Sequence, residues 1–79
     1  MGDLAAAERA YARATLEFPA FAEAHASLGA VRQLRGAFAE AEASYREAAR
    51  THPDLPGLER NRVLLKQQLD SATATQAPP

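Results

Sequence analysis

Two histidines are the residues of this chain best suited to acid–base chemistry or to binding a metal ion. His25 and His52 stand 27 positions apart, and neither has the second histidine four residues away that a helical zinc site uses. The absence of cysteine excludes disulfides, thiol catalysis and thiolate metal sites. The serines have no nucleophile elbow or neighbouring base, and no glycine-rich phosphate loop is present. We therefore expect no enzyme active site, metal site or cofactor.

The charge and hydropathy patterns also exclude two classes of partner. A net charge of −1 leaves no basic excess to hold phosphates, so we expect no nucleic-acid binding. No apolar run approaches the roughly 18 residues that a membrane-spanning helix needs, and the N-terminus lacks the basic and apolar segments of a signal peptide. The sequence therefore predicts a cytoplasmic protein that does not bind membranes.

The apolar composition favours closely packed helices. Of the 79 residues 20 are alanine, whereas valine occurs twice and isoleucine is absent. Alanine has the highest helix propensity, and β-branched residues favour strands. A domain this small buries only about 60% of the surface that its unfolded chain exposes, so its core must be thin.

A set of small, aromatic, acidic and proline residues recurs at an offset of 34 positions. A fixed period of roughly 20 to 50 residues is typical of a helical solenoid. Because the acidic residue recurs with the repeat, we expect it to be structural or solvated rather than catalytic. The recurring residues are Gly2, Ala5, Ala7, Glu8, Tyr11, Ala14 and Pro19, which return as Gly36, Ala39, Ala41, Glu42, Tyr45, Ala48 and Pro53.

Apolar spacings of three and four residues predict four helices in one domain over residues 1–70. Pro19 and Pro53 must end the first and third helices, and Gly36 ends the second as a left-handed cap. Residues 71–79 are rich in Ser, Thr, Ala and Pro and are predicted to form a disordered tail. The expected helices lie at about residues 3–17, 20–35, 37–51 and 58–70.

Residues 22–55 resemble one complete tetratricopeptide repeat. That pattern has Leu-Gly in its first helix, Gly at the turn between helices, then Ala, an aromatic residue, Ala and a closing Pro. The resemblance implies an all-α fold, a short α-solenoid of antiparallel helical hairpins with about four helices. The matching residues are Leu28, Gly29, Gly36, Ala41, Tyr45, Ala48 and Pro53.

The resemblance is partial on either side of this repeat. Residues 2–21 match only the second helix of a repeat, whose first helix would precede Met1. One flank of the first helix, with Leu4 and Tyr11, is then expected to be uncovered. Arg62 and Val63 stand where the pattern has Leu-Gly, so residues 56–70 are expected to form a divergent capping helix.

The resemblance also implies a concave binding face, formed mainly by the first helix of each repeat. Its small residues leave room for a partner, and its amides and guanidinium can hold a peptide backbone or a carboxylate. Ala30 stands where family members that clamp chaperone carboxylates have Asn, so we expect no such clamp. The implied partner-binding residues are Glu23, Ala26, Ser27, Ala30, Gln33, Leu34, Arg60, Asn61, Leu64 and Gln67, with Gln68 in the same register.

We therefore expect a non-catalytic scaffold or adaptor that binds other proteins. It would bind a partner segment through its concave face, or self-associate into an oligomer through its incomplete N-terminal repeat. An alternative is a fragment or regulatory appendage of a larger enzyme, since repeats of this family are often attached to transferases and hydroxylases.

Overall fold

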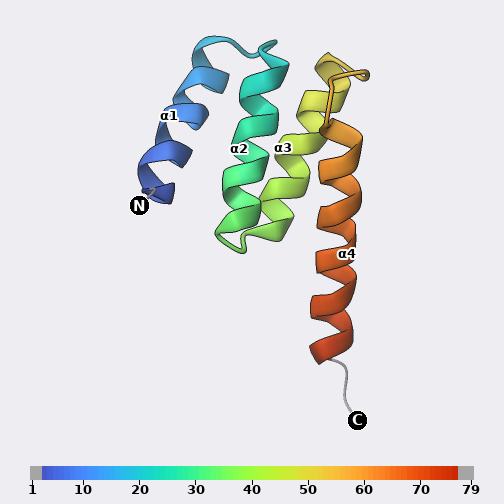
Figure 1. Cartoon of the computed structure of the whole chain (residues 1–79). Helices are drawn as coiled ribbons and strands as arrows, with labels where there is room; N and C mark the ends of the chain where they lie inside the picture. Colours follow the sequence, from blue (N-terminus) through green and yellow to red (C-terminus); the bar gives the residue numbers. More distant parts are fainter. Residues whose placement is uncertain (1–2, 77–79) are drawn as a thin grey trace.

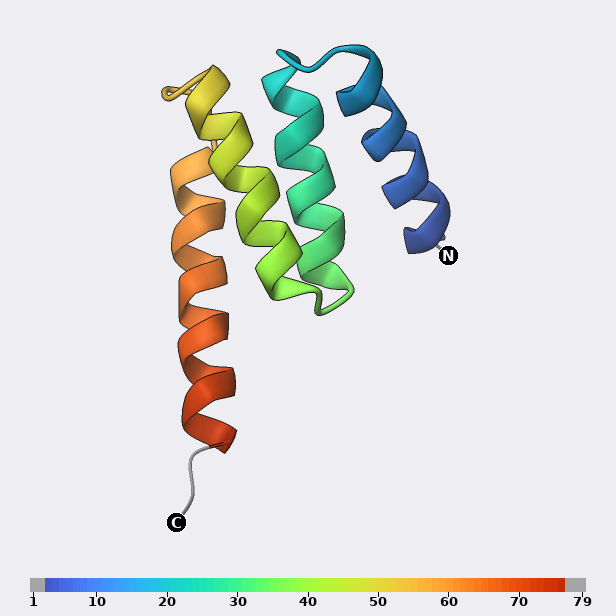
Figure 2. The same ribbon diagram turned by 180° about the vertical axis from the view of Figure 1, so that it is seen from behind.

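The computed structural model describes the backbone of residues 3–76 and the side chains of residues 3–71. Within this range all regular structure is helical, in the four helices α1 (Leu4–Glu17), α2 (Ala22–Leu34), α3 (Phe38–Thr51) and α4 (Leu58–Gln76). Each helix packs mainly against its sequence neighbours and runs antiparallel to them (Figure 1). The same order is seen from behind, with α1 and α4 at opposite edges (Figure 2). The predicted all-α fold of helical hairpins is confirmed.

Proline turns separate α1 from α2 and α3 from α4. The Phe21 N–H donates to the Phe18 carbonyl oxygen across Pro19 at 2.9 Å, and the equivalent bond across Pro53 is 3.1 Å. This turn occupies residues 19 and 20, so α2 begins at Ala22 and not at the predicted residue 20. The two turns therefore repeat the 34-residue period in their backbone geometry.

Gly36 closes the hairpin between α2 and α3, as predicted. Its φ is +83°, a conformation that costs glycine little because it has no Cβ. The Ala37 N–H donates to the Arg32 carbonyl oxygen at 2.8 Å and the Gly36 N–H to that of Gln33 at 3.1 Å. This pair of bonds is the Schellman motif, which satisfies carbonyls left open at a helix end.

Helix α4 is longer than predicted. It continues to Gln76, six residues beyond the expected end at Asp70, into the segment that was predicted to be a disordered tail. Residues 71–76 contain neither glycine nor proline, so no local signal stops the helix there. The rest of that predicted tail, residues 77–79, lies outside the described residues.

The core lies between α2, α3 and α4, around Tyr45. The Tyr45 side chain is only 1% exposed, and Ala41 and Ala48 beside it on α3 are fully buried. On α2, a Cβ added to Gly29 would come within 2.7 Å of the Tyr45 ring, so this close helix approach requires glycine. By contrast, no residue of α1 is fully buried.

Candidate functional site

A groove of about 580 Å³ opens between α2 and α4. An adjoining hollow of about 400 Å³ shares three of its lining residues, so the two form one surface. We call this surface the α2–α4 groove. Its lining residues are Ala30, Gln33, Leu34, Arg35, Gly36, Phe38, Tyr45, Asn61, Leu64, Gln67, Gln68 and Ser71.

The groove brings together six of the ten partner-binding residues implied by the sequence: Ala30, Gln33, Leu34, Asn61, Leu64 and Gln67. The other four, Glu23, Ala26, Ser27 and Arg60, lie on the same two helices but line neither hollow. Their end of the helices is closed, because Leu55 and Leu58 are buried there in one cluster with Ala22. Ala26 packs against that cluster.

A chain of hydrogen bonds forms the floor of the groove and joins three helices. The Tyr45 hydroxyl on α3 donates to Gln33 Oε1 on α2 at 2.7 Å. The Gln33 Nε2 group in turn donates to Gln68 Oε1 on α4 at 2.5 Å. Burial raises the pKa of the Tyr45 phenol, which keeps it protonated as a donor at neutral pH.

The hydroxyl of Tyr45 is a groove feature that sequence reasoning missed, since the residue was identified only as the aromatic position of the repeat. The signal was available, because a buried tyrosine hydroxyl usually finds a hydrogen-bond partner. Phe38 was likewise not among the implied partner-binding residues, yet it lines both parts of the groove.

The chemistry of the groove is apolar and neutral. Leu34 and Leu64 are 73% and 47% exposed at its rim, while amide groups of glutamine and asparagine offer donors and acceptors. Arg35 is the sole charged side chain among the described lining residues, and it forms an ion pair with Glu8. The groove therefore suits an uncharged segment better than a carboxylate.

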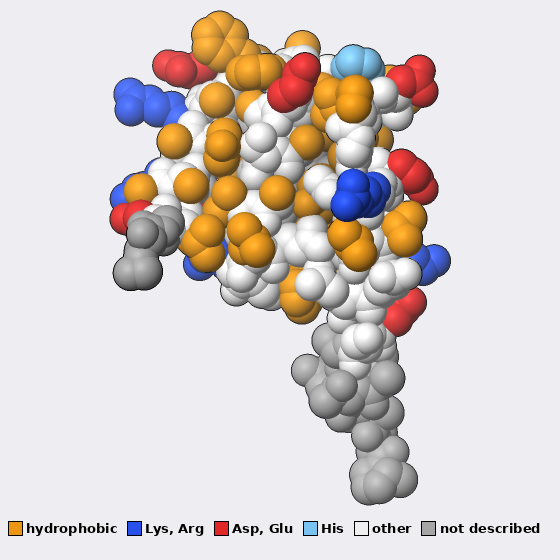
Figure 3. Space-filling view, viewed as in Figure 1, with side chains coloured by type: hydrophobic (Ala, Val, Ile, Leu, Met, Phe, Trp, Pro, Cys, Tyr) orange, Lys and Arg blue, Asp and Glu red, His pale blue; other side chains and the backbone are white. Residues whose placement is uncertain are grey.

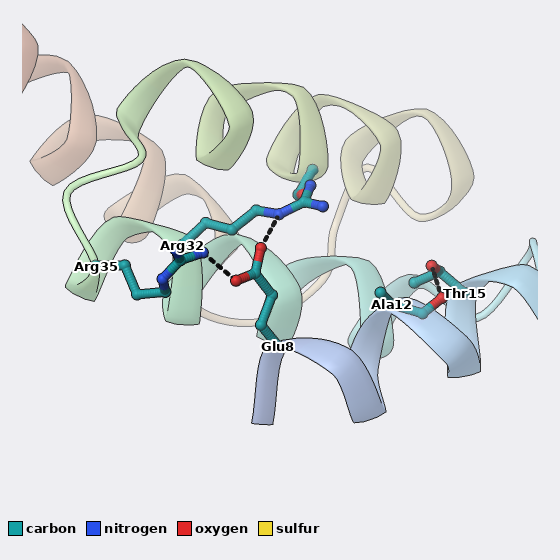
Figure 4. Close-up of polar contacts among 6 residues, drawn as sticks. Glu8, Ala12, Thr15, Arg32 and Arg35 are labelled. Atoms are coloured by element: carbon teal, nitrogen blue, oxygen red, sulfur yellow. Dashed lines mark hydrogen bonds and ion pairs between the residues drawn. The ribbon is translucent and has the colours of Figure 1, made fainter. Parts of the chain in front are cut away.

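A polar cluster fastens α1 to α2, and α2 to α3 (Figure 4). The Glu8 carboxylate accepts a hydrogen bond from Arg32 Nε at 3.1 Å and also pairs with Arg35. The Arg32 guanidinium continues to Ser44 Oγ on α3, donating through Nη1 at 2.8 Å. The hydrogen bond from Arg32, together with the nearby charge of Arg35, lowers the pKa of Glu8. The carboxylate is thus held ionised at the contact between α1 and α2.

The outer flank of α1 is a second exposed surface. Leu4 and Tyr11 are 36% and 38% exposed, and Leu16, Phe18 and Phe21 are also exposed towards the turn after α1. Figure 3 shows hydrophobic side chains spread over α1 and α2, with charged side chains mainly around the margin. This surface matches the uncovered flank that the sequence led us to expect.

Neither histidine lines the α2–α4 groove. His25 Nε2 donates to the Pro19 carbonyl oxygen at 2.9 Å, which ties α2 to the preceding turn, and His52 is exposed. Among the described residues, no group of three His, Cys, Asp or Glu side chains could hold a metal ion. None of the described helices has both the length and the apolar character needed to cross a membrane.

Comparison of the chain with family models, curated proteins and solved structures finds no match. Over the described residues, its own geometry establishes a four-helix, all-α fold with antiparallel neighbours.

Proposed function

We propose that this protein is a non-catalytic protein-interaction module of the tetratricopeptide-repeat type, which binds a partner segment in the α2–α4 groove. The observation that carries the proposal is the meeting of Gln33, Leu34, Asn61 and Leu64, from two helices far apart in sequence, on one hollow surface. A groove that exposes apolar side chains beside amide groups, among them those of Asn61 and Gln67, suits a peptide segment.

The packing of residues 22–55 supports the repeat type. In the tetratricopeptide pattern, the small residues let paired helices approach closely. Here Gly29 faces the Tyr45 ring at a distance that no Cβ would allow, and Ala41 and Ala48 are fully buried on either side of that ring. The close packing of Gly29, Tyr45, Ala41 and Ala48 is what this pattern would produce, and it supports the proposal.

The partner segment should be uncharged at its centre. Leu34, Leu64 and Phe38 offer contacts to apolar side chains, whereas Asn61 and Gln67 can bond to a peptide backbone. A partner carboxylate would find no free guanidinium among the lining residues, because Arg35 is engaged by Glu8.

Affinity purification with the wild-type chain and a Leu64→Ala/Gln67→Ala variant, from cells that produce the protein, tests the groove. Both residues are exposed, so the variant should keep its fold and lose the specific partners. Arg60→Ala is the matched control, since Arg60 lies on the same helix outside the groove. Recovery of the same partners by the wild-type chain and the double variant would refute the assignment.

The outer flank of α1 supports docking of another helix as a second mode, of which self-association is one form. The supporting observation is the exposure of Tyr11, whose repeat counterpart Tyr45 is buried. Sedimentation over a range of concentrations tests self-association directly. A species that stays monomeric at high concentration would exclude it.

A further inference from the structure

The chain contains an internal template for what covers the outer flank of α1. Helices α1 and α3 carry the same Ala, Tyr and Ala at the 34-residue offset. Helix α3 contacts both α2 and α4, whereas α1 contacts only α2, the helix that follows it. Accordingly Tyr45 is 1% exposed and Tyr11 is 38% exposed. We call the stripe of Leu4, Ala7, Tyr11 and Ala14 the Tyr11 flank.

Two residues of α2 show how a tyrosine at this repeat position is covered. Gly29 brings the helix backbone against the ring, where a Cβ would lie 2.7 Å from the Tyr45 Cε1 atom. One helical turn later, Gln33 Oε1 accepts the Tyr45 hydroxyl hydrogen bond at 2.7 Å. The cover is thus a helix with glycine and an amide four residues apart, on one face.

The turn after each helix supplies an independent second comparison. Leu55 is 8% exposed and shares a buried cluster with Ala22, at the start of α2. Its counterpart Phe21 is 45% exposed. A covering helix should therefore also carry a small residue seven positions before its glycine, as Ala22 precedes Gly29.

We infer that the Tyr11 flank binds a helix from outside residues 1–79, antiparallel to α1, that carries a small residue, a glycine and an amide at the spacing of Ala22, Gly29 and Gln33. The inference rests on the proposal that the chain is an interaction module, and adds the kind of helix that its α1 accepts.

A second copy of this chain is a poor source of that helix. In one copy Gly29 already lies against its own Tyr45. Helix α4 has Gln67 at the position of Gln33 but Val63 at that of Gly29. A valine there would overlap the tyrosine ring, because even a single Cβ comes too close. Arg62 also replaces Leu28, which is buried in α2.

A synthetic peptide with the sequence of residues 21–36 is the probe, titrated into the isotopically labelled full chain and followed by NMR. Saturable shifts are expected in α1 around Tyr11. A peptide with valine at the Gly29 position should bind at least about tenfold more weakly, since overpacking is costly. Tyr11→Ala in the protein should weaken binding of the original peptide to a similar degree. Because Tyr11 is exposed, this substitution should leave the fold intact.

Four results would overturn the inference. The first is no saturable binding, and the second is equal binding of the glycine and valine peptides. The third is concentration-dependent sedimentation of the wild-type chain that Tyr11→Ala abolishes, which would make a second copy the occupant. Shifts confined to the α2–α4 groove would also count against it while leaving the groove proposal standing. Conversely, loss of groove partners by Leu64→Ala/Gln67→Ala has no bearing on Tyr11.

Discussion

The two copies of the repeated segment, on α1 and α3, use the same residues in opposite ways. On α3, Tyr45 is buried and Glu42 is exposed, paired only with Arg46 on its own helix at 3.3 Å. On α1, Tyr11 is exposed while Glu8 is largely buried against α2. Identical side chains at identical positions thus differ in exposure according to which neighbouring helix is present.

The helices that pack against each copy explain this difference in exposure. The glutamate position of each copy faces the helix that follows it. After α1 that helix offers Arg32 and Arg35, which both reach Glu8. After α3 it offers Lys66 and Leu69 at the equivalent positions. Leu69 packs against the core, so α4 replaces part of a polar contact with an apolar one.

The largest expected difference between the two copies is at their tyrosines. Tyr45→Ala removes the largest fully buried side chain and should lower the free energy of unfolding by about 3 to 5 kcal/mol, enough to unfold much of a small domain. Tyr11→Ala should cost less than about 1 kcal/mol. Urea denaturation followed by circular dichroism measures both. Similar costs for the two substitutions would show that α1 is as well packed as α3.

Gly29→Ala should give the next largest effect. The added Cβ meets the Tyr45 ring at 2.7 Å, and overpacking of this kind costs about 1 to 3 kcal/mol. The matched control is Val63→Ala at the same repeat position on α4, where the side chain is 45% exposed and the change should stay within about 1 kcal/mol. If Gly29→Ala did not change the free energy of unfolding in the same assay, the Tyr45 ring would not be packed as tightly against α2 as the structure shows.

Substitution of the two glutamates should show the opposite pattern, with the larger effect on α1. Both effects should be smaller than those of the tyrosine and glycine substitutions. Glu8→Gln removes the charge that Arg32 and Arg35 share, so α1 should become the least protected helix in hydrogen exchange. Glu42→Gln breaks only an exposed pair with Arg46 and should leave exchange unchanged, as exposed pairs contribute little. Equal exchange in the two variants would contradict the role of Glu8 in fastening α1.

The smallest expected effect is a pH dependence that belongs to Glu8. Its pKa is lowered from 4.5 in the folded chain, so the ionised carboxylate stabilises the fold above pH 4.5. That contribution is lost as the pH falls through the lowered pKa. In thermal unfolding across this pH range, the stability of the wild type should fall more steeply with decreasing pH than that of Glu8→Gln. Glu47, whose pKa Arg50 also lowers, is present in both proteins and so does not contribute to the difference between them. If the stability of both proteins changed with pH in parallel, Glu8 would be excluded as the source of the pH dependence.

Local signals predicted the helices well wherever a proline or glycine acts on its own neighbours. Pro19 ended α1 and Gly36 ended α2 as expected, because φ restriction and the left-handed cap need no tertiary contact. The start of α2 lies two residues later than predicted, because a turn hydrogen bond precedes it. The end of α4 lies later than predicted, because residues 71–76 contain no helix-breaking residue.

The candidate groove was predictable only in part. Its register along α2 and α4 followed from the repeat, which placed Gln33 and Asn61 together. The repeat did not indicate which end of the groove is open, because that depends on Leu55 and Leu58 filling the other end. The Tyr45 hydroxyl joined the floor for a similar reason, as its acceptor belongs to another helix.

By itself the sequence determined the helical period, the helix-ending residues and the 34-residue repeat, since each of these depends on residues close together in the chain. Only the tertiary structure decided which copy of the repeat buries its tyrosine and which pairs its glutamate with a neighbouring helix. The physical reason is that burial depends on the neighbouring helix, and the pattern that defines Tyr11 and Tyr45 is the same on both helices while their neighbours differ.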